Sequence, residues 1–215
     1  LNNYIKIALR SLLAHRLYSS INILGLALGL ACCILMALFV NYELGYDHQY
    51  AKSDRIARIH MSQVSSAGND QWPRTGAGWK PLLEDTYSQI VKVGRIALQQ
   101  TDLKVGDITI SETISYADQE IFDIFEFNFL KGNRDTAFDK VHSVVLTSST
   151  AQNLFGSDDP MGKTISFFGM VDLEVTGIIA ELPENTHLAN NSFANLQAAA
   201  EFMGGEAFLS NMFNM

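Results

Sequence analysis

Residues 21–40 (INILGLALGLACCILMALFV) are twenty consecutive positions without a charged side chain. A helix rises by about 1.5 Å per residue, so a helix of this length spans roughly 30 Å, the thickness of a bilayer's hydrocarbon core. The pattern predicts one transmembrane helix, which we place at residues 19–41. A cleaved signal peptide is the alternative, but its apolar region is usually about 7–15 residues long.

The residues before this span follow a helical pattern. Apolar residues recur at the spacing i, i+3, i+4, i+7, and polar residues fall opposite them; the apolar set is Ile5, Ala8, Leu9 and Leu12, and the polar set is Asn3, Lys6 and Arg10. This pattern predicts an amphipathic helix at residues 1–18 that lies on the inner leaflet, with its cations toward anionic headgroups. The alternative is that these residues form the first turns of one long membrane helix, with a bend between His15 and Ser20.

The remaining residues, 42–215, show short stretches of strand and helix pattern in turn. Strands are expected at residues 55–64, 90–99, 143–147 and 171–176, and short helices near Pro81, after Asp118 and from Ser148 to Gly156. Residues 65–78 are expected to be a loop. Gly106-Asp107, between two alternating stretches, is typical of a type II′ hairpin turn. The fold class is therefore α+β: a transmembrane helix preceded by an amphipathic helix, then a mixed α/β extracytoplasmic domain of βαβ-like units.

Charge is distributed unevenly about the apolar span. Lys6, Arg10 and Arg16 precede it without any acidic residue, whereas 12 Lys and Arg and all 23 Asp and Glu follow it, a net charge of −11 against −8 for the whole chain. Basic residues beside a span resist translocation, which predicts a cytoplasmic N-terminus and an extracytoplasmic domain. The acidic domain argues against nucleic acid as a partner.

The sequence offers little enzyme chemistry. Gly162-Lys163-Thr164 resembles the end of a phosphate loop, but five residues separate Gly156 from Gly162 where that motif needs four. The chain has no HExxH, CxxC or GxSxG motif, and its five histidines do not pair at metal-ligand spacing. We therefore expect no catalytic residue, metal ligand or cofactor in this chain.

Gly25 and Gly29 form a small-xxx-small motif within the apolar span. Two glycines four residues apart lie on one face of a helix, where they allow another helix to approach closely. We expect a helix–helix contact at this face. The alternative is a chance spacing, because glycine is common in membrane helices.

Several short motifs follow one another in an order that resembles the permease subunits of MacB/FtsX-like ABC transporters, with their MacB-like periplasmic core domain. The resemblance covers essentially the whole chain and rests on the basic start and the apolar span followed by Glu43-Leu-Gly-Tyr-Asp47, Asp54-Arg55-Ile56, Ser143-Val-Val-Leu-Thr147, Phe155-Gly156, Asp159-Pro-Met-Gly-Lys163, Val175-Thr-Gly-Ile178 and Leu182-Pro-Glu-Asn-Thr-His187.

The resemblance implies a non-catalytic subunit of the bacterial inner membrane whose large domain, residues 42–215, lies in the periplasm. Its implied partners are a cytoplasmic ABC ATPase that binds ATP, a second permease copy or half, membrane lipid and a periplasmic adaptor. Export, extraction of lipoproteins and signalling are all functions of such permeases. A membrane-anchored extracytoplasmic sensor or binding domain is the alternative function.

We expect the residues of these motifs to have structural roles. Phe155 is expected to fill the core, Gly156 to end a helix in a left-handed conformation, and Pro160 and Gly162 to shape a turn. Gly177 suggests a bulge or a close backbone approach, and Pro183 to His187 a rigid exit loop. The chain starts at Leu1 and shows no second apolar span before Met215, so we expect it to be the N-terminal fragment of a longer permease.

Overall fold

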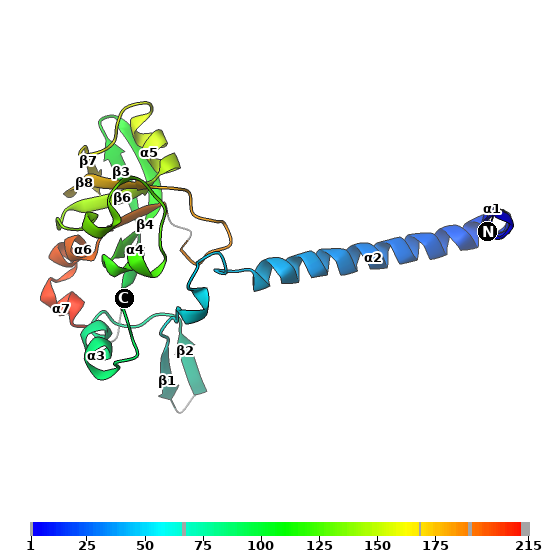
Figure 1. The fold of residues 1–215 in the computed structure, drawn as a ribbon, viewed down its shortest axis with the longest axis horizontal. Helices are drawn as coiled ribbons and strands as arrows, with labels where there is room; N and C mark the ends of the chain where they lie inside the picture. Colours follow the sequence, from blue (N-terminus) through cyan, green and yellow to red (C-terminus); the bar gives the residue numbers. More distant parts are fainter. Residues whose placement is uncertain (1, 66–67, 168, 189–190, 212–215) are drawn as a thin grey trace. The chain divides into compact units, whose positions relative to one another are not determined.

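The computed structural model describes residues 2–65, 68–167, 169–188 and 191–211 (Figure 1). It divides into two compact units, Leu1–Tyr46 and Asp47–Met215. Each unit is described by itself below.

The first unit consists of two helices, α1 (Asn2–Ala14) and α2 (Arg16–Leu44). They are separated at His15, whose backbone leaves the helical region at φ −116° and ψ 55°. Within the described residues, α2 is the one helix that is long and apolar enough to cross a membrane. It extends beyond residues 19–41 at both ends, because the polar residues that flank the span also adopt helical conformation.

A mixed sheet forms the centre of the second unit. Its strands are β3 (Ile96–Val105), β4 (Ile108–Ala117), β5 (Phe129–Gly132), β6 (Ser143–Thr147), β7 (Thr164–Phe167), β8 (Val171–Ile179) and β9 (Ser192–Asn195). They pair in the order β5-β8-β6-β9-β4-β3-β7, and β7 pairs with β8 as well. Six of the strands therefore close into a ring, and β5 lies outside it on β8.

Two of the pairings are parallel, β4 with β9 and β6 with β8, and the others are antiparallel. Helix α5 (Ser148–Phe155) lies in the connection from β6 to its parallel neighbour β8. This connection is a βαβ-like unit with β7 inserted, so the predicted mixed α+β domain is confirmed. The hairpin at Gly106-Asp107 is also present, because Val105 pairs with Ile108 and Gly106 has a positive φ of 56°.

Two hydrophobic clusters lie on opposite faces of the sheet. Alternate residues of a strand point to opposite faces: Val144 and Leu146 of β6 belong to the larger cluster, and Val145 between them to the smaller. Helices α5 and α6 (Leu196–Met203) cover the larger cluster. Helix α4 (Glu120–Ile124) covers the smaller one, where the Phe122 ring meets the rings of Phe127, Phe129, Phe138 and Phe193 at centroid distances of 4.9–6.1 Å.

The remaining elements are short. They are the 3₁₀ turns η1 (Ser53–Arg55) and η2 (Arg134–Thr136), strands β1 (Met61–Ser65) and β2 (Gly68–Trp72), and helices α3 (Trp79–Thr86) and α7 (Glu206–Leu209). Strands β1 and β2 pair with each other as a separate two-stranded antiparallel sheet.

Three of the predicted elements were wrong in position. The strand expected at residues 55–64 begins only at Met61. The loop expected at 65–78 contains β2, a mostly polar segment that pairs with β1 and shows no alternation of apolar and polar residues. The strand expected at 90–99 begins at Ile96. An added Cβ at Gly94 would lie 2.6 Å from Ile121 Cδ1, so the chain there passes closely over α4 instead of pairing.

The side chain of Asp118, the residue before the predicted helix, does not cap that helix. Gln119 is the residue before α4, and the carboxylate of Asp118 accepts hydrogen bonds from Arg95 and Lys80 instead. Arg95 holds this carboxylate in a bidentate charge-assisted pair and Lys80 adds a second cationic donor, so cations occupy the oxygens that would otherwise accept from the helix.

Candidate functional site

Asp47 follows the last residue of α2, Leu44, by three positions in the sequence. Its φ of 58° lies in the left-handed region, which asparagine and aspartate adopt more readily than other non-glycine residues. Its backbone N–H donates to the carbonyl oxygen of Asn185 over 3.0 Å. The chain just after the apolar helix is therefore held by a loop that lies about 140 positions further along the sequence.

The carboxylate of Asp47 accepts three hydrogen bonds from that loop. Thr186 Oγ1 donates to Oδ1 over 2.7 Å, and the backbone N–H of His187 donates to the same oxygen over 3.0 Å. Nδ1 of His187 lies 2.5 Å from Oδ2 and acts as the donor to the ionised carboxylate. Both carboxylate oxygens are therefore occupied.

Tyr50 extends this network into the smaller hydrophobic cluster. Its hydroxyl lies 2.8 Å from Thr186 Oγ1, which also accepts the backbone N–H of Leu188 over 3.2 Å. Since the Thr186 proton goes to Asp47, the Tyr50 hydroxyl donates to Thr186. Tyr50 and Thr186 are buried, and the Tyr50 ring meets that of Phe125 edge-on at 4.9 Å. We call Asp47, Tyr50, Thr186 and His187 the Asp47 cluster.

Two side chains in this cluster, Asp47 and Tyr50, have pKa values shifted from their ordinary values. Burial opposes ionisation of Asp47, but the hydrogen bonds from Thr186 and His187 outweigh it, and the pKa of Asp47 lies below its ordinary value. Burial raises the pKa of the Tyr50 hydroxyl, despite its bond to Thr186. At neutral pH the cluster therefore contains a carboxylate and a neutral phenol.

The same loop is fastened at its other end by Glu181. Its carboxylate accepts hydrogen bonds at the first turn of α5, from Ser148 Oγ over 2.7 Å and from Ser149 N and Oγ over 2.6 and 2.9 Å. Burial opposes ionisation here too, but these bonds leave the pKa of Glu181 below its ordinary value. A carboxylate at a helix N-terminus is also favoured by the helix dipole. Residues 181–187 therefore connect α5 with the chain that follows α2.

The structure brings one predicted site residue, His187, into this cluster. Pro183, at the start of the same loop, is exposed. Gly25 and Gly29 lie on α2, where an added Cβ at either position meets nothing within 4 Å.

The other predicted residues lie around the sheet. Phe155 is only partly buried, at the edge of the larger cluster, and Lys163 Nζ lies 5.4 Å from the centre of its ring. Gly156 has a φ of 60° and a ψ of −121°, which is not the expected left-handed helical conformation, although a positive φ still favours glycine. Pro160 is buried, and Gly162 has a φ of 72° and donates its N–H to Val175 over 2.8 Å.

Gly177 lies beside an irregularity in the pairing of β6 with β8. Val144 pairs with Val175 and Val145 with Gly177, so Thr176 is the extra residue of a bulge. An added Cβ at Gly177 would lie 2.8 Å from Phe129 Cε1. The glycine thus combines a bulge with a close approach.

Sequence reasoning missed Asp47, Tyr50 and Thr186. Asp47 and Thr186 both lie in motifs that carry the family resemblance, but the two motifs are far apart in sequence and no spacing joins them. Only the fold shows that these motifs are in contact.

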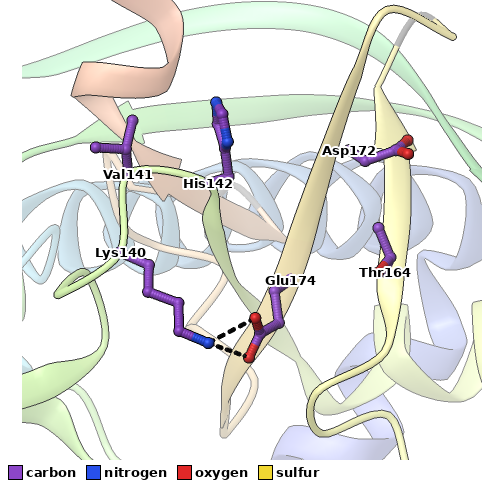
Figure 2. Close-up of a pocket in the computed structure, with 6 residues that line it drawn as sticks. All are labelled: Lys140, Val141, His142, Thr164, Asp172 and Glu174. Atoms are coloured by element: carbon purple, nitrogen blue, oxygen red, sulfur yellow. Dashed lines mark hydrogen bonds and ion pairs between the residues drawn. The ribbon is translucent and has the colours of Figure 1, made fainter.

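A second candidate is a hollow beside the chain that leads into β6 and on β7 and β8. A hollow of about 480 Å³ is lined by Lys140, Val141, His142, Thr164, Asp172 and Glu174 (Figure 2). Lys140 Nζ donates to both carboxylate oxygens of Glu174, over 2.8 and 2.7 Å, and His142 Nε2 lies 2.8 Å from a Glu201 oxygen. Across the described ranges, no group of three or more His, Cys, Asp or Glu residues is arranged to hold a metal ion.

Comparison with solved structures identifies the fold of the sheet-rich unit. A domain of a protein assigned as a permease from Porphyromonas gingivalis superposes with a TM-score of 0.60 at 16% identity, over 72% of this chain and 65% of that one. The periplasmic region of MacB from Actinobacillus actinomycetemcomitans superposes with a TM-score of 0.50 at 18% identity, over 61% of this chain and 60% of that one. The chain thus spans less than two thirds of either structure.

Among curated proteins, none matches this chain in sequence. The family model of the MacB-like periplasmic core domain matches residues 19–211, which include all but the first three residues of α2 and nearly all of the sheet-rich unit. The chain therefore belongs to the MacB-like periplasmic core domain family of ABC-type permeases.

Proposed function

We propose that the chain is part of a permease subunit of a MacB/FtsX-like ABC transporter, in which ATP hydrolysis by a cytoplasmic partner moves the periplasmic domain for export, extraction or signalling. The family match over residues 19–211 carries this proposal. In it, α2 crosses the bacterial inner membrane, the N-terminus is cytoplasmic and the sheet-rich unit is periplasmic. The excess of basic residues before α2 and of acidic residues after it supports this orientation.

The Asp47 cluster supports a mechanical role for the start of the domain. Asp47 is fixed to the loop of Thr186 and His187 by four hydrogen bonds, counting its own N–H. A displacement of the chain that follows α2 is therefore passed to that loop instead of being absorbed by a flexible linker. The proposed role of the cluster is to keep this connection stiff while the transporter cycles.

The test is coupling in the complete transporter. The full permease and its ATPase are reconstituted together in lipid vesicles, and ATP hydrolysis is measured with wild-type permease, with Asp47→Ala and with Thr186→Val. We expect the permease to change the ATPase rate and both variants to reduce that change while the complex still assembles. An ATPase whose rate does not respond to the permease would overturn the proposed function.

Orientation is tested separately with a reporter. Alkaline phosphatase fused after Met215 should be active in intact cells, because the enzyme folds only outside the cytoplasm. A green fluorescent protein fused at the same point and exported through the general secretion pathway should be dark. Fluorescence together with an inactive phosphatase would overturn the orientation.

A further inference from the structure

Charge is distributed unevenly within the sheet-rich unit. Residues 55–74 carry three arginines and one aspartate, a net charge of +2, whereas residues 75–215 carry 8 Lys and Arg against 19 Asp and Glu, a net charge of −11. The summed charges of a surface attract partners of opposite sign and repel those of the same sign. An anionic partner is therefore attracted to residues 55–74 and repelled by the rest of the unit.

Two of these arginines lie where the ends of the β1–β2 hairpin meet. Arg58, three residues before β1, donates a hydrogen bond from its guanidinium to the carbonyl oxygen of Pro73, the residue after β2. The guanidinium carbon of Arg74 lies 6.0 Å from the centre of the Trp72 ring. We call the following exposed residues the hairpin base: Arg58, Ile59, Trp72 and Arg74.

The cations of the hairpin base are not neutralised by carboxylates. Of the twelve Lys and Arg residues in the sheet-rich unit, eight form an ion pair within the described residues, and Arg55, Arg58 and Arg74 are three of the four that do not. Ile59 and Trp72 beside them are 42% and 43% exposed. This combination suits a membrane–water interface, where tryptophan lies at the level of the headgroups and basic side chains reach the phosphates.

The sequence limits how far the hairpin base lies from the end of the apolar helix. Tyr42 and Tyr46, whose rings meet edge-on at 6.4 Å, lie at the end of α2 and just after it. Tyrosine is enriched at the boundary of the hydrocarbon core. Arg58 follows Tyr46 by twelve positions, which span at most about 43 Å when the chain is fully extended. The surface of any membrane that α2 crosses is therefore within reach of the hairpin base.

We propose that the hairpin base binds anionic phospholipids of the leaflet that faces the sheet-rich unit, with Arg58 and Arg74 at the phosphates and Ile59 and Trp72 between the headgroups. That this leaflet is the periplasmic one rests on the orientation in the proposed function. Each basic side chain near an anionic surface changes the binding equilibrium about fivefold. Because the acidic remainder of the unit is repelled by the same lipids, only the hairpin side of the unit is held at the membrane.

The experiment measures contact between the hairpin base and lipid headgroups. The full-length permease, with all other cysteines including Cys32 and Cys33 replaced by serine, carries a fluorophore at Ile59→Cys or at Leu98→Cys. Leu98 is the control position, an aliphatic residue of β3 that is 61% exposed. Vesicles contain phosphatidylcholine alone or phosphatidylcholine mixed with phosphatidylglycerol. Part of the phosphatidylcholine carries a nitroxide on its headgroup, which quenches the fluorophore only at short range.

We expect the label at the hairpin base to be quenched in phosphatidylglycerol vesicles and the label at Leu98 to remain bright. Arg58→Gln with Arg74→Gln should lower the ratio of bound to free hairpin about 25-fold, and high salt should weaken binding as well. Arg58→Lys with Arg74→Lys keeps both charges and should retain the quenching. The matched control, Lys104→Gln with Lys131→Gln, removes two cations from β3 and β5 and should change nothing.

Equal quenching of the hairpin-base label in phosphatidylcholine alone, or no quenching in either lipid, would overturn the proposal. Equal losses in the glutamine and lysine variants would show that the structure of the hairpin and not its charge makes the contact, and would overturn it too. Energy transfer between hairpin-base labels of two copies, without quenching by lipid, would assign this surface to a second permease copy instead. Failure here leaves the ATPase response intact, whereas failure of the proposed function removes that response and leaves the quenching in place.

Discussion

The guanidinium of Arg95 donates two parallel hydrogen bonds to the carboxylate of Asp118, from Nε to Oδ2 and from Nη2 to Oδ1, each 2.9 Å long. The backbone N–H of Arg95 and Nζ of Lys80 donate to the same carboxylate over 3.0 and 3.2 Å. The side chains of Arg95 and Asp118 are only 15% and 8% exposed. Arg95 thereby links the chain before β3 to the end of β4, and Lys80 links helix α3 to the same carboxylate.

Asp118→Ala should destabilise the domain strongly. It leaves two largely buried cations without their shared carboxylate, and breaking a buried pair in this way costs about 3 kcal/mol or more. Unfolding can be followed by the fluorescence of Trp79, which starts α3 beside Lys80.

The matched control for that variant is Asp159→Ala, which removes the exposed ion pair with Lys131. It should leave the unfolding midpoint unchanged, because exposed pairs contribute little. Equal midpoints for the two variants would show that the Arg95–Asp118 pair does not stabilise the fold.

The Asp47 cluster should make stability depend on acidity. The folded-state pKa of Asp47 is below its ordinary value of 3.8, so the group stabilises the fold fully above pH 3.8 and loses that contribution as the pH falls through the folded value. Asp47→Asn should therefore lower the free energy of unfolding at pH 7 but leave it unchanged near pH 2. The measurement is the unfolding midpoint of both proteins between pH 7 and pH 2.

Glu181 allows an independent check of the same reasoning. The pKa of Glu181 also lies below its ordinary value, here 4.5. Glu181→Gln should therefore lower the free energy of unfolding above pH 4.5, and this loss should disappear as the pH falls below the pKa of the folded state. If both variants kept a constant difference from the wild type down to pH 2, the loss would come from packing instead of ionisation.

Gly132 should be the least replaceable glycine of the sheet. Its φ is 82°, and an added Cβ would lie 2.4 Å from the carbonyl oxygen of Thr176, which is backbone and cannot rotate away. Gly132→Ala combines strain with overpacking, each about 1–3 kcal/mol. Gly106→Ala is the control, since its φ is 56° but nothing lies within 4 Å of an added Cβ. The difference between the losses of unfolding free energy in the two variants gives the overpacking contribution, and Gly106→Ala should cost clearly less.

The glycine face of α2 gives a prediction about assembly. Gly25→Leu with Gly29→Leu should weaken association between membrane helices, because the larger side chains keep a partner backbone at a distance. Ala27→Leu with Ala31→Leu is the matched control, since it adds leucines about 200° around the same helix. Energy transfer between labelled permeases in vesicles reports association. A loss of signal in both variants, or in neither, would argue against a specific contact at Gly25 and Gly29.

The sequence predicted those elements whose pattern is local. The apolar helix, the strand at 143–147 with the helix after it, and the Gly106-Asp107 hairpin depend on residues that are neighbours in the chain. The start of β3 could not be predicted this way, because the contacts of Gly94 with α4 and of Arg95 with Asp118 decide where pairing begins.

The candidate site shows the same division. His187 could be selected from its motif, and Gly177 from the rarity of glycine in a strand. Asp47 and Thr186 could not be joined from sequence, because their contact depends on where β8 ends and how the loop returns.

Strand β7 pairs with β3 on one side and with β8 on the other. In the part of the chain that the structure describes, this leaves β5 as the main sheet's open border, and β5 is four residues long with an exposed Lys131 in its middle. Short borders carrying lysine are poor templates for intermolecular strand addition and aggregation. The edge of the main sheet at β5 therefore offers another copy of the domain a poor template for strand addition.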